Sequence, residues 1–223
     1  MSTPDLRRTI LDASVALVAE QGVRAVSFRE VARRAGVSHQ APYHHFGNHH
    51  GILEAIAREG FSELTAAMRS AALAEPHDAL AALVASGVAY VRFALSHVGH
   101  FRVMFHSRVA PAGADPCPLE EAEATYQALS ELCSRAHSEG HGRTLDPDAM
   151  AHLCWSVVHG LSTLMIEGAL DPKVAVPAMD EESLTRQVVH SLGHLLRAAP
   201  DTPGARPPGS PRKAPRRPRK PAT

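Results

Sequence analysis

Apolar residues recur at intervals of three or four along most of the chain, the spacing that places them on one face of an α-helix. Such stretches cover roughly residues 5–21, 48–74 and 80–95 and continue, with interruptions, to residue 197. Nowhere do apolar and polar residues alternate over a length that would indicate a β-strand. The pattern predicts an all-α fold.

Two helices are expected before residue 35. The first has Thr3 as its N-cap and Pro4 in its first turn, and Gly22 ends it. The second is short and follows Ser27, because Ser27 and Glu30 have the spacing of a capping box. In that motif each side chain accepts a hydrogen bond from the other residue's backbone amide. These helices begin a compact N-terminal head.

A glycine turn leads into a third short helix. Gly36 can adopt the left-handed conformation that closes the second helix, and Val37-Ser38 restarts the chain into a helix that ends near Phe46. Pro42 falls within the first turn of this third helix, where a missing amide costs little. Two short helices joined by a glycine turn form a helix-turn-helix.

Asn48 can cap a long fourth helix that Pro76 stops. After it, the same periodicity and capping signals predict helices around residues 80–95, 101–105, 120–138, 147–167 and 181–197, with a proline-rich loop over 110–118. The chain is therefore expected to have three parts: a helix-turn-helix domain over residues 1–50 with a connecting helix at about 48–74, a larger helical domain over 76–199, and a tail over 200–223.

The composition separates the tail from the rest of the chain. Of 223 residues 44% are hydrophobic and 4% aromatic, which favours helices packed through small side chains. The net charge is zero, but residues 201–223 hold seven of the 23 Lys/Arg and only one of the 23 Asp/Glu. This basic, proline-rich tail is predicted to be disordered, and it either binds DNA electrostatically or serves solubility alone.

Several classes of protein are disfavoured. No run approaches the roughly 18 uncharged apolar residues of a membrane helix, and the N-terminus is unlike a signal peptide, so a cytoplasmic protein is expected. Cys117, Cys133 and Cys154 lack paired spacing, which argues for buried or idle thiols rather than a disulfide framework or zinc site. No nucleotide-binding glycine loop, nucleophile elbow or carboxylate pair is present, so neither an enzyme nor a cofactor is expected.

The head carries the most specific signal in the sequence. Residues 28–38 (FREVARRAGVS), followed by residues 43–46 (YHHF), closely resemble the signature of the TetR family of transcriptional regulators. The resemblance implies a DNA-binding head joined to a helical ligand-binding and dimerisation domain. It also implies a homodimer that binds a palindromic operator in double-stranded DNA and releases it when a small effector binds. Repression is the family default, and activation is the alternative.

The DNA-facing residues are expected on the second and third helices. A glutamine amide can read adenine and an alanine can touch a thymine methyl, which suits Gln40 and Ala41. The resemblance places Tyr43 and His44 mainly on the DNA backbone, and the second helix would hold phosphates. The complete expected set is Ser27, Arg29, Arg33, Ser38, His39, Gln40, Ala41, Tyr43 and His44.

The head also departs from the common family pattern. His39 stands where the family often has a lysine, and His49-His50 replace a frequent Lys-Glu pair, so the head carries little positive charge at pH 7. Together with His44 and His45, these histidines leave a second interpretation open. In it, the chain is a helical small-molecule- or metal-binding protein without specific DNA binding. A metal site is not predicted, because successive helix residues diverge by about 100°.

Residues of the larger domain suggest where an effector binds. Residues 93–105 mix aromatic, sulfur and imidazole groups, which suits a pocket for a small hydrophobic molecule but equally suits an apolar core. Residues 155–161 (WSVVHGL) resemble the Trp-His-Gly segment of one TetR subgroup. The candidate ligand-binding residues are Phe93, His97, Phe101, Met104, Phe105, Trp155 and His159.

Dimerisation is expected through the last two helices. The resemblance pairs them with their counterparts in a second subunit as a four-helix bundle. A helix pair within one chain is the alternative. The candidate interface residues are Val188, Leu192, Gly193, Leu195 and Leu196.

Overall fold

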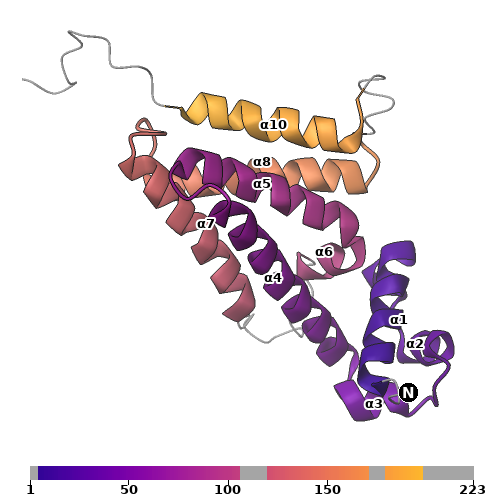
Figure 1. The fold of residues 1–223 in the computed structure, drawn as a ribbon. Helices are drawn as coiled ribbons and strands as arrows, with labels where there is room; N and C mark the ends of the chain where they lie inside the picture. The colour runs from indigo at the N-terminus through magenta and orange to yellow at the C-terminus, as the bar shows by residue number, and fades with distance from the viewer. Residues whose placement is uncertain (1–4, 106–119, 171–178, 198–223) are drawn as a thin grey trace, which may run out of the picture.

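The computed structural model describes residues 5–105, 120–170 and 179–197. Within these ranges every regular element is a helix, and the helices form a small N-terminal head and a larger body (Figure 1). The predicted all-α fold, with a helix-turn-helix head and a helical body, is confirmed. The predicted loop over 110–118 and the tail from residue 200 lie outside the described residues.

The head consists of three α-helices and a 3-10 turn: α1 (Leu6–Gln21), η1 (Val23–Ala25), α2 (Phe28–Ala35) and α3 (Ala41–Phe46). The N-cap of α1 is Asp5, whose carboxylate accepts from the Arg7 amide at 3.0 Å. The predicted cap, Thr3, lies outside the described residues. An aspartate with extended backbone in front of a helix satisfies a free amide as well as a threonine does.

Only one of the two hydrogen bonds of the predicted capping box is present. Ser27 Oγ accepts from the Glu30 amide at 3.3 Å, as expected. The Glu30 carboxylate does not return to the amide of Ser27 but accepts two hydrogen bonds from the guanidinium of Arg33. A charge-assisted bidentate pair is stronger than a carboxylate–amide contact, which explains the difference.

In the described residues, the body contains a long connecting helix and five further helices. The connecting helix starts at Asn48, whose side chain accepts from the Gly51 amide at 3.0 Å, so the predicted cap is confirmed. Asp146 and Asp180 also cap their helices as predicted. The helices are α4 (His49–Leu73), α5 (Ala79–Ser96), α6 (Val98–Met104), α7 (Glu120–Ser138), α8 (Pro147–Ile166) and α10 (Glu181–Leu196).

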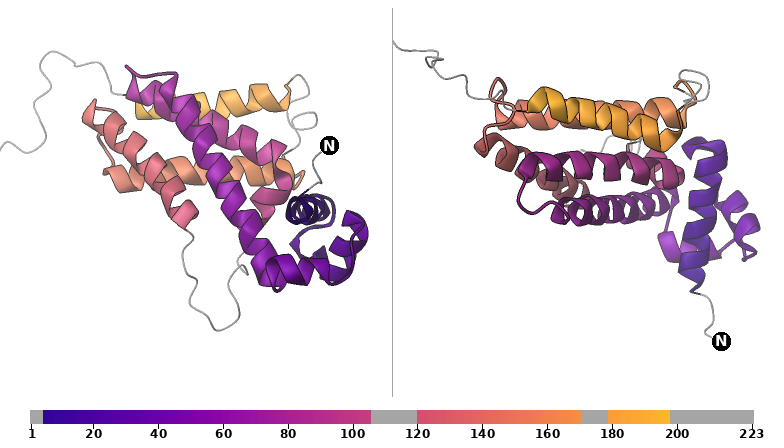
Figure 2. Two further views of the ribbon diagram at one scale, coloured as in Figure 1. Left: turned by 60° about the horizontal axis from the view of Figure 1, so that its bottom comes forward. Right: turned by 45° about the horizontal axis from the view of Figure 1, so that its top comes forward.

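One continuous apolar core links the head to the body. Helix α4 runs from the head into the body, where it packs against α5, α6 and α7. Helices α8 and α10 cover the other side of α5 (Figure 2). Ile10 and Leu17 of α1 and Ile56 and Leu64 of α4 are fully buried in the same cluster. The head is therefore packed on the body.

Helices α5 and α8 are each long and apolar enough to cross a membrane, judged by length and composition alone. The sequence-based expectation that no segment reaches this threshold was wrong for them. Just over half of the α5 window is buried inside the protein, where the helix packs against α4, α7, α8 and α10. Its apolar character is accounted for by this central position.

Candidate functional site

The turn between α2 and α3 has the geometry that the sequence predicts. Gly36 closes α2 with φ +67° and ψ +31°, a left-handed conformation that glycine adopts without strain. Val31 and Ala32 are buried on the inner side of α2. Their burial orients α2 so that Arg29 and Arg33 remain exposed.

Eight of the nine predicted DNA-facing residues are exposed on the head. Ser38, His39 and Gln40 lie in the turn that precedes α3, and Tyr43 and His44 lie on α3 itself. The exposed residues are Ser27, Arg29, Arg33, Ser38, His39, Gln40, Tyr43 and His44. They belong to α2, α3 and the segments before each helix.

The prediction for Ala41 was wrong. Its side chain is only 6% exposed and packs into the core cluster of the head. The sequence suggested a helix starting near Val37, whereas α3 begins at Ala41. In this shorter helix Ala41 and Pro42 face inward and Tyr43 faces outward.

Tyr43 is held in place by an aromatic contact. Its ring meets the ring of Phe28 edge to face, with centroids 4.6 Å apart and an interplanar angle of 81°. The residue is nevertheless 54% exposed. Phe28 thus fixes the ring against the start of α2, and a solvent-facing phenol remains available for a hydrogen bond.

The histidines of the head do not converge. Among the described residues, no group of three or more His, Cys, Asp or Glu side chains is placed to hold a metal ion. His50 lies 3.8 Å from Glu54, one turn further along α4. The other four histidines, His39, His44, His45 and His49, are exposed.

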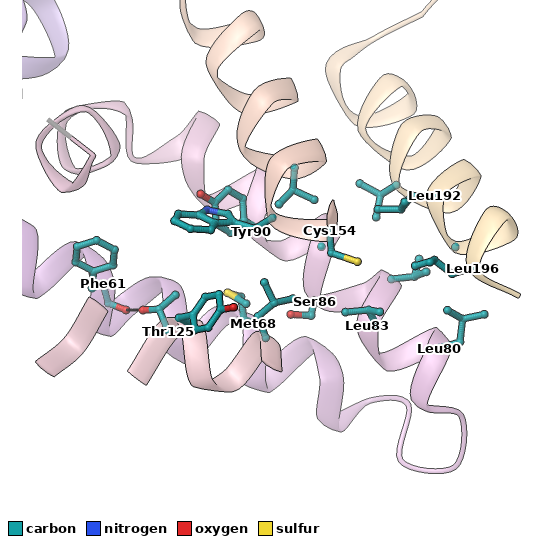
Figure 3. Close-up of a pocket in the computed structure, with 18 of the residues that line it drawn as sticks. Phe61, Met68, Leu80, Leu83, Ser86, Tyr90, Thr125, Cys154, Leu192 and Leu196 are labelled. Carbon is teal, nitrogen blue, oxygen red and sulfur yellow. Dashed lines mark hydrogen bonds between the residues drawn. The ribbon is translucent and has the colours of Figure 1, made fainter. Parts of the chain in front are cut away.

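A cavity of about 240 Å³ lies inside the body (Figure 3). One water needs only about 10–15 Å³ of such space, so the cavity accommodates a small organic molecule. Its walls come from α4, α5, α7, α8 and α10 and from Phe105 at the end of α6. The lining residues are Phe61, Met68, Leu80, Leu83, Val84, Ser86, Gly87, Tyr90, Phe105, Ala122, Thr125, Tyr126, Leu129, Cys154, Trp155, Val158, Val189, Leu192, Gly193 and Leu196.

Two of the seven predicted ligand-binding residues, Phe105 and Trp155, line this cavity. A third, His159, lies beside it and contacts the ring of Phe105 with centroids 4.5 Å apart. The other four, from α5 and α6, do not line this cavity, and their part in ligand binding stays a prediction. They are Phe93, His97, Phe101 and Met104.

Those four residues belong to the packing between α4, α5 and α6. Phe93 stacks on His97 with centroids 4.5 Å apart. His97 is half-buried and lies 3.6 Å from the Glu63 carboxylate. Phe101 and Met104 are buried in the core. The mixture of aromatic, sulfur and imidazole groups that suggested a pocket mostly fills the space under α6.

Part of the predicted dimer interface lines the cavity instead. Leu192, Gly193 and Leu196 are buried on the inner face of α10, and Val188 is half-buried. A Cβ at Gly193 would meet Val84 of α5, so this glycine lets two helices of one chain approach closely. Leu195 is different, because it is 84% exposed. The apolar stripe on α10 therefore packs mostly within the chain, which was the alternative interpretation.

Comparisons with known families agree with this architecture. The family described as "Bacterial regulatory proteins, tetR family" matches residues 10–56. The family described as "Tetracyclin repressor-like, C-terminal domain" matches residues 83–192, and the two matches together cover more than half of the chain. The chain belongs to the TetR family. It is a DNA-binding transcriptional regulator with a helix-turn-helix head, from a family that is not enzymatic.

Curated relatives of this TetR-family regulator match over a limited length. The HTH-type transcriptional regulator BetI of Rhizobium meliloti (strain 1021) is 35% identical over 85 residues, which is 36% of this chain and 41% of the relative. BetI of Serratia proteamaculans (strain 568) is 38% identical over 86 residues, which is 37% of this chain and 43% of the relative. The chain thus matches about two fifths of the length of these relatives.

Solved structures match over nearly the whole fold. A protein of unknown function from Rhodococcus sp. RHA1 has a TM-score of 0.71 and 29% identity, covering 87% of this chain and 96% of that one. The TetR family transcriptional regulator PfmR from Thermus thermophilus has a TM-score of 0.65 and 22% identity, covering 84% of this chain and 98% of that one. The second likeness concerns the fold alone.

In the TetR-family regulator, one end of the cavity carries an aromatic hydrogen-bonded group. The Tyr90 hydroxyl lies 3.0 Å from Nδ1 of His159, and the Trp155 ring lies edge to face against the ring of His159 with centroids 6.2 Å apart. Burial raises the pKa of Tyr90, although the nearby Trp155 indole opposes this shift. Burial also lowers the pKa of His159, so His159 is neutral at pH 7. The group is uncharged and rigid.

His159 gives the regulator a predictable response to acid. A lowered pKa in the folded state means that the unfolded chain takes up the proton more readily. The stabilising effect of the neutral imidazole is therefore complete above the ordinary pKa of about 6.5 and is lost as pH falls below it. We expect the free energy of unfolding, measured with urea, to fall from pH 7.5 to 5.5 by less in His159→Gln than in the wild type. Equal losses in both proteins would contradict this assignment.

Two cysteines meet between α7 and α8. Cys133 and Cys154 are both free and buried, as the sequence suggested, although they are far apart in the chain. The neighbouring Cys154 thiol and burial both raise the pKa of Cys133. Cys117 lies outside the described residues.

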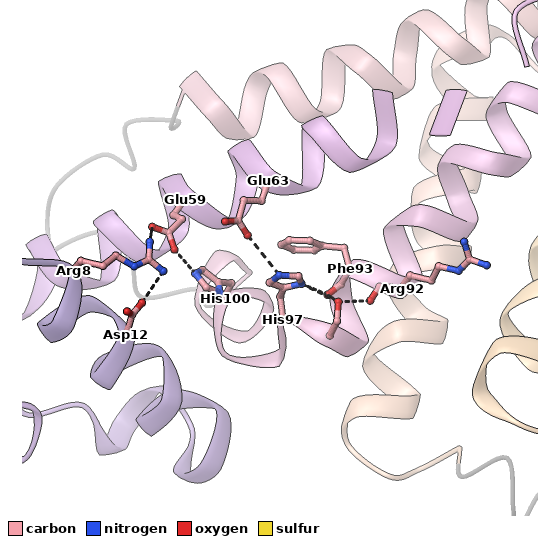
Figure 4. A network of polar contacts seen from close by, with 9 residues as sticks. Arg8, Asp12, Glu59, Glu63, Arg92, Phe93, His97 and His100 are labelled. Atoms are coloured by element: carbon pink, nitrogen blue, oxygen red, sulfur yellow. Dashed lines mark hydrogen bonds and ion pairs between the residues drawn. The ribbon is translucent and has the colours of Figure 1, made fainter. Parts of the chain in front are cut away.

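A polar network joins the head to the body (Figure 4). Arg8 of α1 lies 2.6 Å from Asp12 and 2.7 Å from Glu59 of α4. The other carboxylate oxygen of Glu59 accepts from Nε2 of His100 on α6 at 3.0 Å. These contacts connect α1, α4 and α6 where the head meets the body.

Helix α6 also contacts α1 directly. Arg102 donates to the backbone carbonyl of Ala19 at 2.9 Å and to Glu167 beyond α8 at 3.1 Å. Gly99 faces the carbonyl of Val15, where a Cβ would collide with the oxygen. Since Phe105 at the end of α6 lines the cavity, α6 lies between the cavity and the head.

Proposed function

We propose that this regulator is a cytoplasmic homodimeric repressor that binds a palindromic operator and releases it when a small hydrophobic effector fills the body cavity. The observation that carries the proposal is the position of α6. One end of α6 borders an apolar cavity, and its side packs on α1 of the DNA-binding head. Because α6 contacts both, a molecule bound in the cavity can change the position of the head.

The exposed surface of the head supports the DNA-binding part of the proposal. Gln40, at the start of α3, is free to reach base edges in the major groove, and Ser38 and His39 extend the same edge. Arg29 and Tyr43 are exposed, and we expect the Arg29 guanidinium and the Tyr43 phenol to bind phosphates. Arg33 contributes less net charge than the sequence suggests, because Glu30 is paired with it.

Exposed apolar residues on α8 and α10 support a homodimer. Leu153 and Leu164 of α8 are 40% and 47% exposed, and Leu195 of α10 is 84% exposed. A Cβ at Gly160 would meet nothing within 4 Å, so the outer face of α8 has room for a neighbouring helix. We propose this face, rather than the inner stripe of α10, as the dimer interface. Trp155, His159 and Gly160 are consistent with the Trp-His-Gly subgroup, which also belongs to the proposal.

Effector release requires different affinities for two arrangements of the heads. An occupant beside Phe105 presses on the end of α6, and α6 transmits any shift to α1 through Gly99 and Arg102. Because α1 and α4 form the base of the head, a shift of α1 changes the separation of the two recognition helices. Two half-sites about 34–36 Å apart then no longer fit.

The Tyr43 phenol is expected to bind a phosphate. Tyr43→Phe keeps the ring on Phe28 but removes the hydroxyl, so operator affinity is expected to fall about 3- to 10-fold, the effect of one lost hydrogen bond. Fluorescence anisotropy with a labelled operator measures the change. Tyr126→Phe, which removes a phenol far from the head, is the matched control. An unchanged affinity in Tyr43→Phe would remove Tyr43 from the interface.

Sedimentation equilibrium of the full chain, alone and with its operator duplex, tests the proposed assembly. We expect twice the mass of one chain in the free protein and two chains on one duplex. One chain per duplex at saturation, with a monomer in solution, would refute the proposed dimeric repressor.

A further inference from the structure

Ser86 is a buried hydroxyl that the body leaves without a partner. It is 1% exposed, and its Oγ makes no hydrogen bond within the described structure. A buried serine in a helix commonly returns its hydroxyl to the preceding turn, as Ser14 and Ser162 do at 2.8 and 2.7 Å. Ser86 instead lines the cavity, between Met68 and Leu83 in Figure 3. An unpaired buried hydroxyl is costly, and an occupant with an oxygen atom would satisfy it.

The other hydroxyl groups among the described lining residues already have partners. Tyr90 is bonded to His159. Thr125 Oγ1 is bonded to Thr65 at 2.7 Å and to the Glu121 carbonyl at 2.8 Å. The phenol of Tyr126 lies 3.4 Å from Nε2 of His152. Among the described lining residues, Ser86 is the one whose hydroxyl remains available to an occupant.

The described lining residues carry no charge. None of them is Lys, Arg, His, Asp or Glu. A carboxylate or ammonium group inside the cavity would lose its hydration without gaining an opposite charge, which strongly disfavours binding. The wall therefore selects against ionised molecules and accepts neutral ones.

The extent of the cavity along α5 indicates the length of the occupant and the position of its polar atom. Its lining residues on α5 run from Leu80 to Tyr90, which at 1.5 Å per residue corresponds to about 15 Å. Ser86 lies near the middle of this stretch. An aliphatic chain of about nine or ten carbons has a similar length, and its polar atom would meet Ser86 only if it stood near the middle of the chain.

We propose that the effector is an uncharged, elongated and largely aliphatic molecule with one hydrogen-bonding oxygen near its middle, which accepts from Ser86 Oγ. This inference rests on the proposed function in that it concerns the effector cavity of the same regulator. It adds the chemical class of the molecule and the residue that recognises its oxygen.

Trp155 provides a direct readout of binding. It lines the cavity and is the single tryptophan of the chain, so tryptophan fluorescence comes from a residue of the cavity wall. The full-length protein is titrated at pH 8 with three probes of similar size: 5-nonanone, butylbenzene and nonanoate. The first offers a central oxygen, the second none, and the third a charge. The same titrations are made with Ser86→Ala and with Ser162→Ala.

The wild type is expected to bind 5-nonanone and to bind nonanoate at least about 30-fold more weakly. Ser86→Ala is expected to weaken 5-nonanone binding about 3- to 10-fold and to leave butylbenzene binding unchanged. Ser162→Ala removes an equally buried hydroxyl that is already bonded outside the cavity, so it is expected to bind all three probes like the wild type. Ser86→Ala is also expected to melt at no lower temperature than the wild type, because it removes an unpaired group.

Three outcomes would overturn the inference: nonanoate binding as tightly as 5-nonanone, equal 5-nonanone affinity in the wild type and Ser86→Ala, or no binding of 5-nonanone. None of these outcomes changes the sedimentation result with operator DNA. Failure of this ligand class is thus distinguishable from failure of the proposed dimeric repressor.

Discussion

Replacing Leu164 and Leu195 together with aspartate is expected to produce monomers that bind operator DNA at least about 100-fold more weakly. Full burial of a leucine side chain contributes about 1.5–3 kcal/mol, and a twofold interface buries each side chain twice. Aspartate removes this contribution and brings like charges together. A monomer holds one half-site only, and each 1.4 kcal/mol lost costs a factor of ten in affinity.

The matched control is Leu73→Asp. Leu73 is 78% exposed at the end of α4, outside the proposed interface, so the same substitution is expected to leave both dimer and affinity unchanged. Size-exclusion chromatography with light scattering gives the mass, and anisotropy gives the affinity. A double variant that remains dimeric would show that the outer face of α8 and α10 is not the interface.

Gly99→Val is expected to lower the free energy of unfolding by about 1–3 kcal/mol and to abolish the effect of cavity occupants on operator affinity. The new side chain would collide with the backbone carbonyl of Val15, which cannot rotate away as a side chain does. Helices α1 and α6 must separate as a result. The contact through which α6 acts on the head would then be lost.

Gly87→Ala is the control for stability. A Cβ at Gly87 meets only methyl groups, those of Val189 at 3.0 Å and Val158 at 3.4 Å, which can shift slightly. Urea unfolding is expected to show a clearly smaller loss for this variant than for Gly99→Val. Operator release by a cavity-binding molecule is measured for the wild type and Gly99→Val. A normal release response in Gly99→Val would exclude α6 as the route to the head.

The helix boundaries and caps were largely predictable because they depend on local chemistry. Asn48, Asp146 and Asp180 each cap a helix with a side-chain oxygen, and Gly36 adopts the left-handed conformation that its position requires. These signals act over three or four residues, so a sequence displays them directly. Asp5 replaced the predicted N-cap Thr3 because two nearby residues could both perform that role.

The inner and outer faces of the body helices were less predictable. Leu192 and Leu196 form an apolar stripe with the same spacing whether the partner is another chain or α5. Likewise, Phe93 and Phe101 suit a core as well as a pocket. The decisive information is which helix packs on which, and that arises from contacts between residues far apart in the chain, such as Val84 beside Gly193. Ser86 became visible as a candidate only once the cavity was located.

Selection of bound sequences from random duplex DNA tests the central claim most directly. It is made with the full-length protein and with a chain ending after Ala199, which lacks the basic tail. We predict that both proteins enrich the same palindrome, because the specificity lies in the head and the dimer. Enrichment of no motif by either protein, with salt-sensitive binding by the full-length chain alone, would contradict the account and leave a helical binding protein with a nonspecific DNA-binding tail.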